Sequence, residues 1–202
     1  MTQRADQVID IAYRIARFLA WCGGGLILIA ALIVAFDVVI RKLFNMTVGG
    51  AEEIAGYSLA IGSALGFGFA LFERAHIRID SIYERLPTRG KVVLDLLSML
   101  AVLAFFFLVA RYAYNVFNQS VVSDAHSLSW LGTPMAVPQF VWLVGLVFFV
   151  LTALLLLLRS VLALATGDLH TFFQLIGPKS AVEDLEQQID NARSDPQKAG
   201  TK

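Results

Sequence analysis

The sequence predicts an all-α integral membrane protein with four transmembrane helices, an amphipathic N-terminal helix and both termini in the cytoplasm. Four apolar runs each reach about the 20 residues that an α-helix needs to cross ~30 Å of hydrocarbon. They lack the period-2 alternation of a membrane strand, and only a helix then satisfies its own backbone inside a bilayer. The uneven distribution of lysine and arginine predicts the orientation. The runs cover residues 18–40, 54–72, 92–110 and 140–158.

The composition agrees with a membrane protein. Charged residues make up 16% of the chain and hydrophobic residues 57%, whereas a soluble domain has about 25% charged residues. The formal net charge is zero, so there is no general electrostatic attraction to nucleic acid. We therefore expect no nucleic-acid partner.

The first span follows a basic, amphipathic segment. Arg14 and Arg17 precede an apolar run, as in a signal peptide, but this run has 23 residues and no small-residue cleavage site follows it. A signal peptide has an apolar run of only ~7–15 residues, so we expect an uncleaved span. Ahead of it, apolar residues recur at helical spacing between Val8 and Leu19. This pattern predicts an amphipathic helix that lies on the inner surface or continues into the span.

Basic residues predict which connections are cytoplasmic. The two tails and the 73–91 connection together contain thirteen lysines and arginines, whereas the other two connections contain only Arg41 and Lys42. Cytoplasmic segments of membrane proteins are enriched in lysine and arginine. Both termini and the 73–91 loop are therefore expected in the cytoplasm.

The connections define the rest of the organisation. Gly49 and Gly50 interrupt the helix before the second span, and Pro138 suits the first turn of the fourth helix. We expect one four-helix membrane domain over residues 1–165 and a segment at the membrane interface over 166–178. The polar residues 179–202 are expected to form a disordered cytoplasmic tail.

The second span has small residues at every fourth position. Such spacing lets two helix backbones approach closely, which stabilises helix association in a bilayer. The row could pack against another helix of this chain, or it could contact a separate membrane subunit, and both can hold together. Its members are Ser58, Gly62, Gly66 and Ala70.

Charged residues near the outer ends of the first two spans form a candidate polar cluster. Asp37 precedes Arg41 by four residues, so the two share a helix face and can pair; a proton or cation role for Asp37 is the alternative. Glu52 and Glu53 begin the second span, where the helix dipole favours carboxylates. They could pair with Arg41 across the connection or remain solvated. We expect all four residues to form an outer polar cluster.

The cytoplasmic loop contains a further polar group, which we expect to form a structured turn: Arg74, His76, Arg78 and Asp80. The three histidines of the chain do not have metal-ligand spacing, and we see no phosphate-binding loop or catalytic nucleophile motif. We therefore expect no cofactor, no metal site and no enzymatic activity. The spans also lack the proline-interrupted helices and internal repeats that are common in transporters acting alone.

Several segments, taken in order, give a family resemblance. They are RKLFN at 41–45, GAEE at 50–53, the small-residue row, HIRID at 76–80 and Leu86–Pro87. Over residues 10–165 the chain resembles the small, four-helix Q-type membrane subunit of tripartite ATP-independent periplasmic (TRAP) transporters.

The resemblance implies a role in uptake of carboxylate-bearing organic acids by a secondary transporter. A large membrane subunit would hold the substrate and sodium sites, and a periplasmic binding protein would deliver the acid. The small subunit would act as a scaffold among membrane lipids. Two alternatives remain open: a homodimeric proton-coupled exporter that uses Asp37, and a four-span assembly protein without a transport role.

Overall fold

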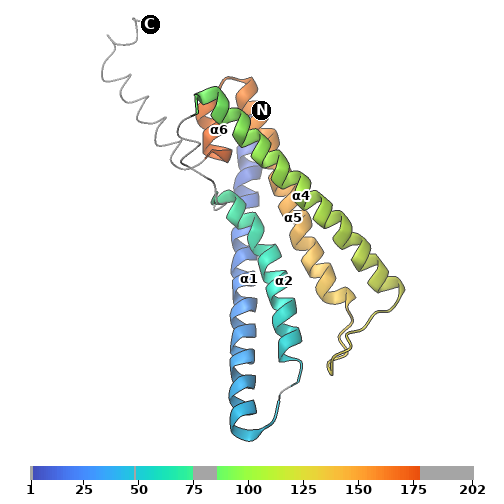
Figure 1. Ribbon diagram of the computed structural model, residues 1–202. Coiled ribbons are helices and arrows are strands. Elements are labelled where there is room, and N and C mark those ends of the chain that lie inside the picture. Colours follow the sequence, from blue (N-terminus) through green and yellow to red (C-terminus); the bar gives the residue numbers. More distant parts are fainter. Residues whose placement is uncertain (1, 48, 75–85, 178–202) are drawn as a thin grey trace, which may run out of the picture.

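The structure, a computed structural model, describes residues 2–47, 49–74 and 86–177. These residues form five helices and no strand (Figure 1): α1 (Thr2–Phe44), α2 (Ala51–Phe72), α4 (Thr88–Val122), α5 (Ala136–Ala165) and α6 (Leu169–Ile176). The first four are long and apolar enough to cross a membrane. The predicted all-helical class and the four spans are confirmed, and the orientation of the termini stays a prediction.

The N-terminal amphipathic segment continues directly into the first span. α1 is one helix of 43 residues, about 65 Å long at 1.5 Å per residue, so it is roughly twice as long as the hydrocarbon is thick. Its apolar residues Val8, Ile11 and Ile15 are exposed. The opposite side holds α1 to the end of α2, where Tyr13 donates a 3.1 Å hydrogen bond to Glu73.

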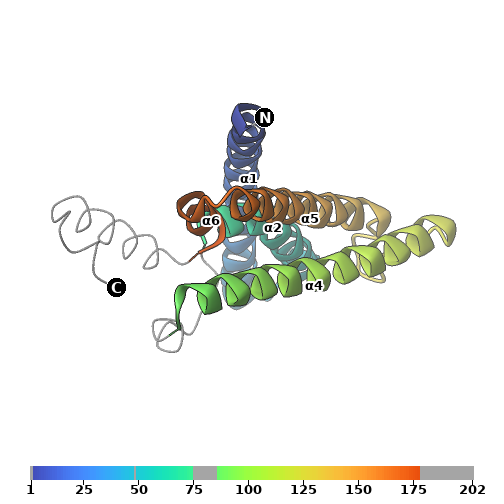
Figure 2. The same cartoon turned by 90° about the horizontal axis from the view of Figure 1, so that it is seen from above.

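The helices pack as two neighbouring pairs. α1 lies beside α2, and α4 lies beside α5, while α2 also contacts α5. The view from above shows α5 between the N-terminal part of α1 and α4 (Figure 2). α5 therefore occupies the centre of the packing, and it has more buried residues than any other described helix.

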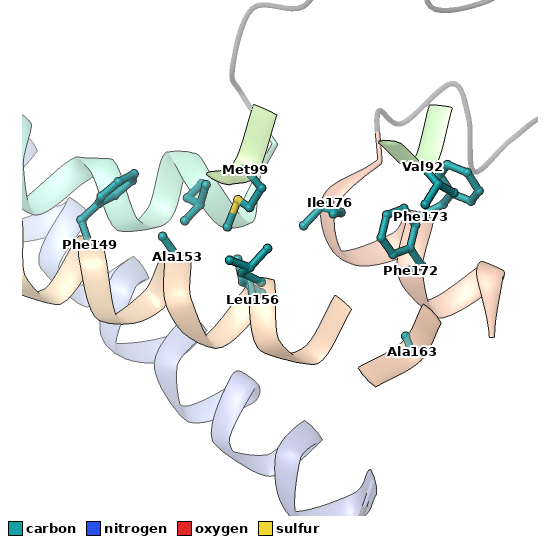
Figure 3. Packing of buried hydrophobic residues seen from close by; sticks show 11 residues of the cluster. Val92, Met99, Phe149, Ala153, Leu156, Ala163, Phe172, Phe173 and Ile176 are labelled. Carbon is teal, nitrogen blue, oxygen red and sulfur yellow. The ribbon is translucent and has the colours of Figure 1, made fainter. Parts of the chain in front are cut away.

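The main apolar core lies where α5 meets α4, α2 and α6 (Figure 3). Phe149, Leu156 and Met99 are almost fully buried there, and the Phe149 ring lies 4.2 Å from that of Phe106, centroid to centroid. Phe172 and Phe173 of α6 join this cluster and are at most 1% exposed. The segment predicted to lie at the membrane interface therefore also packs against the helix bundle.

α4 is longer than the apolar run that predicts it. The run ends at residue 110, but the helix continues to Val122 because polar residues without glycine or proline do not stop it. Its end is a left-handed turn at Asp124, with a φ of 48°, closed by a 3.0 Å hydrogen bond from the Ala125 N–H to the Ser120 carbonyl. Glycine usually occupies this position, so the end of α4 could not be predicted from a glycine signal.

Polar contacts hold both ends of α6. The Asp168 carboxylate accepts hydrogen bonds from the Thr171 hydroxyl at 2.5 Å and from the Thr171 backbone N–H at 3.0 Å. These two bonds lower the pKa of Asp168 below its ordinary value. At the other end, Arg74 donates to the Gly177 carbonyl at 3.3 Å. The end of α2 is thus connected to the end of α6.

We expect replacement of Asp168 by alanine to loosen α6. Loss of an N-cap costs about 0.5–2 kcal/mol, and this exposed site belongs at the lower end of that range. Because the folded-state pKa is lowered, the stabilisation is present above pH ~4 and is lost as the pH falls through the folded-state value. Hydrogen exchange of residues 169–176 should speed up at neutral pH in Asp168→Ala. Asp168→Asn should keep the cap and lose its pH dependence; equal exchange in all three proteins would contradict this.

Candidate functional site

The four predicted outer residues line one pocket. Asp37, Arg41, Glu52 and Glu53 surround a cavity of about 600 Å³ at the ends of α1 and α2 where these helices are joined. The rest of the lining includes Thr47 from the connection and residues from neighbouring turns. The spacing in the sequence therefore reflects a real grouping in space, while what the pocket does stays a prediction.

Asp37 is the most buried charged group of this pocket. It is 2% exposed, and its carboxylate receives a 2.5 Å hydrogen bond from Arg41 and a 2.9 Å bond from the Thr47 hydroxyl. The Arg41 side chain is about half exposed, at 54%. The structure thus contains the expected i,i+4 pair. A carboxylate held by a cation and a hydroxyl donor is typical of a structural pair.

Glu53 connects α2 to the segment before α5. Its carboxylate accepts a 2.5 Å hydrogen bond from Tyr57 and a second bond from the Ser129 hydroxyl. Tyr57 also lies 3.2 Å from the Met135 sulfur. Among the described residues Arg41 bonds to Asp37, and the pairing considered for Arg41 with Glu52 or Glu53 stays a prediction. Glu52 is exposed, as expected for a solvated helix start.

Two glycines let the segment between α4 and α5 cover the pocket. Gly49 and Gly50 have φ angles of 68° and 79°, which side chains rarely adopt. A Cβ on Gly50 would lie 2.2 Å from the Leu131 side chain, and a Cβ on Gly49 would lie 3.3 Å from the Trp130 ring. The connection after α1 is therefore packed against a loop that is about 80 residues away in the sequence.

Sequence reasoning missed the residues that this loop supplies. Ser129 lines the pocket and bonds to Glu53, and Leu131 packs against Gly50. No periodicity links them to α2. The only indication in the sequence was the pair Gly49 and Gly50, because glycine is common where the backbone is left-handed or where another segment packs closely.

Part of the small-residue row mediates close packing between α1 and α2. A Cβ on Gly62 would lie 2.8 Å from the Gly23 carbonyl oxygen and 2.7 Å from Ile27. A Cβ on Gly23 would similarly lie 2.7 Å from the Gly62 carbonyl oxygen. The two backbones therefore touch at this crossing. Ser58, one turn earlier, is buried.

The neighbouring face of α2 packs closely on α5. A Cβ on Gly145 would lie 3.0 Å from the Ala64 Cβ, and one on Gly68 would lie 2.9 Å from the Phe148 ring. Gly66 differs, because a Cβ there would meet nothing within 4 Å, and both Gly66 and Ala70 are half-buried. Gly66 thus remains available to a second subunit, which stays a prediction.

Of the predicted cytoplasmic turn, only Arg74 lies within the described residues. It has a left-handed φ of 53° and bonds to the end of α6. His76, Arg78 and Asp80 lie outside the described residues. Within the described ranges, no group of three acidic, histidine or cysteine residues could hold a metal ion.

α1 and α4 present broad apolar faces. On α1, Leu28, Leu32 and Phe36 are each more than 60% exposed. On α4, Phe105 and Phe107 are similarly exposed. In a membrane such faces contact lipid tails or other transmembrane helices.

Comparison with protein families identifies a family that matches most of the membrane-spanning part of the chain. The family described as "Tripartite ATP-independent periplasmic transporters, DctQ component" matches residues 30–163, about two thirds of the chain. The match extends from residue 30 within α1 to near the end of α5 and includes the pocket around Asp37 and the contact between Gly145 and Ala64. It includes Gly62 but not Gly23, the residue of α1 that Gly62 contacts. Neither the curated proteins nor the solved structures include a significant match.

Proposed function

The chain belongs to the DctQ component family of tripartite ATP-independent periplasmic transporters, and we propose that it acts as a scaffold for the large transport subunit. The family accounts for a small, multi-pass membrane subunit of a tripartite system. The scaffold role is supported by the packing, because α2 touches α1 and α5 at backbone level. A unit with such contacts resists deformation, since close-packed interfaces transmit strain instead of absorbing it.

The proposed assembly places the transport chemistry on other chains. The large membrane subunit would hold the substrate and sodium sites, and a periplasmic binding protein would deliver a carboxylate-bearing organic acid. The exposed apolar faces of α1 and α4 offer area for the large subunit and for lipid. The inner membrane, with both termini in the cytoplasm, suits the distribution of basic residues.

Reconstitution tests this proposal directly. Vesicles that contain this chain, the large subunit and the binding protein should accumulate the organic acid when a sodium gradient is applied. Vesicles that contain this chain alone should not. Uptake or proton flux by the chain alone, abolished in Asp37→Asn, would support the exporter alternative. An undiminished rate when the chain is left out would contradict the scaffold role.

Gly66 offers a narrower test of where the large subunit contacts this chain. Gly66→Leu should not lower the thermal stability of the isolated chain, because a Cβ there has no neighbour within 4 Å. It should reduce the amount of large subunit that co-purifies. Gly56→Leu is the matched control, since position 56 is equally open and lies on another face of α2. Co-purification that is equal in the two variants would remove Gly66 from the predicted interface.

A further inference from the structure

An apolar groove lies between the N-terminal half of α1 and the end of α2. It has a volume of about 560 Å³, and its walls include Trp21, Leu28 and Phe69. Its floor includes Gly24 and Gly25, and a Cβ on either would meet nothing within 4 Å. The two glycines therefore do not serve helix packing within the chain, unlike the adjacent Gly23. They leave a hollow on a surface that faces the bilayer.

One cation stands at the end of this groove. Arg17 lines it, is exposed, and forms no hydrogen bond or ion pair with any described residue. Trp21, one turn further along α1, is 75% exposed. Tryptophan favours the headgroup zone, where its ring is partly apolar and its N–H can reach water or an ester. Arginine with a free guanidinium is well suited to bind phosphate.

The length of the groove matches one leaflet. Arg17 and Leu28 are separated by 11 residues, or about 16 Å of helix rise, and half of the hydrocarbon core is about 15 Å thick. An occupant with its anionic group at Arg17 would therefore end near the bilayer midplane at Leu28. This is the depth that one acyl chain of a phospholipid reaches.

From this combination we propose that the groove binds a glycerophospholipid, with the phosphate at Arg17 and an acyl chain over Gly24 and Gly25. On the predicted orientation the lipid belongs to the cytoplasmic leaflet. The site does not depend on the scaffold role, because all of its residues lie on this chain. A transmembrane helix of another subunit is the competing occupant.

Native mass spectrometry of the full chain tests the site with dioleoyl phosphatidylglycerol as the probe. Arg17→Gln should weaken the apparent affinity about fivefold, as expected for loss of one basic residue at a lipid surface. Arg14→Gln is the matched control, three residues earlier and outside the groove, and should bind as the unmodified chain does. Dioleoylglycerol, which has the same chains and no phosphate, should bind weakly and without regard to Arg17.

Filling the groove provides a second test. Gly25→Leu should abolish binding of the probe, because leucine would occupy the acyl-chain path without clashing with the chain itself. The control Gly56→Leu should bind dioleoyl phosphatidylglycerol with the affinity of the unmodified chain. Equal affinity in Arg17→Gln and Arg14→Gln would overturn the proposal. So would a Gly25→Leu protein that retains the lipid but releases the large subunit, because the groove would then be a protein interface. Failure of the uptake assay would leave these results unaffected.

Discussion

Replacement of Gly62 by leucine should prevent α1 and α2 from packing and should give the largest loss of stability among single substitutions in α2. The Cβ alone would lie 2.8 Å from the Gly23 carbonyl oxygen, and backbone atoms cannot rotate away as a side chain can. Overpacking typically costs about 1–3 kcal/mol and sometimes more. We expect at least the upper end of that range, measured as a lower midpoint of thermal unfolding in detergent.

The same change at an open position provides the control. Gly66→Leu adds an identical side chain one turn away, where a Cβ meets nothing within 4 Å. Leucine also has a higher helix propensity than glycine, so this variant should be at least as stable as the original chain. Gly62→Ala should fall between the two. If Gly62→Leu and Gly66→Leu unfold at the same temperature, the backbone contact between α1 and α2 is absent.

The difference between Gly62 and Gly66 shows what the small-residue row of α2 could and could not predict. The every-fourth-residue spacing correctly directed attention to Gly62, because small residues at helical spacing permit close approach. It could not separate Gly62 from Gly66, since both have the same residue type and the same register. The difference depends on where α1 crosses α2, and crossing positions depend on the whole packing arrangement. Likewise, it is the crossing of α2 and α5 that determines the contacts of Ala64 and Gly68 with α5.

The spans were predictable because the bilayer imposes one length and one backbone solution. The ends of the helices were less predictable than the spans. α4 continues past Arg111, whose side chain bonds to Asn115 one turn further on. It ends at Val122, before a left-handed turn at Asp124, a position where glycine is the usual signal. α6 was expected at the interface, but its phenylalanines fill a space between α5 and α4 that no local pattern reveals.

The pocket around Asp37 was also only partly predictable from the sequence. Asp37 and Arg41 were identified from local spacing, which fixes their relation on one helix. The bond between Glu53 and Ser129 was not predicted, because Ser129 comes from a loop 76 positions away. Thr47 was also missed, since a threonine in a connection has no periodicity. Its hydroxyl supplies the second donor to Asp37.

Removal of Arg41 alone should destabilise the chain more than removal of both members of the pair. Arg41→Gln leaves the Asp37 carboxylate, which is 2% exposed, without the Arg41 cation, and loss of one hydrogen-bond partner from a buried group costs about 1–3 kcal/mol, with more for a charge. Because Arg41 is half exposed, solvent screens part of the pair, and we expect a loss within that range. Asp37→Asn removes the charge, and its amide oxygen can still accept from Thr47.

The double variant Asp37→Asn/Arg41→Gln distinguishes this explanation from simple loss of a contact. If the main cost is the buried charge, the double variant should be more stable than Arg41→Gln, because Asp37→Asn removes the buried negative charge that Arg41 balances. If the two residues act independently, the two losses should add, and the double variant should be the least stable. Thermal unfolding of the four proteins in one detergent gives the coupling energy. Additive losses would show that Asp37 does not depend on Arg41, and the pocket would then need another source of charge balance.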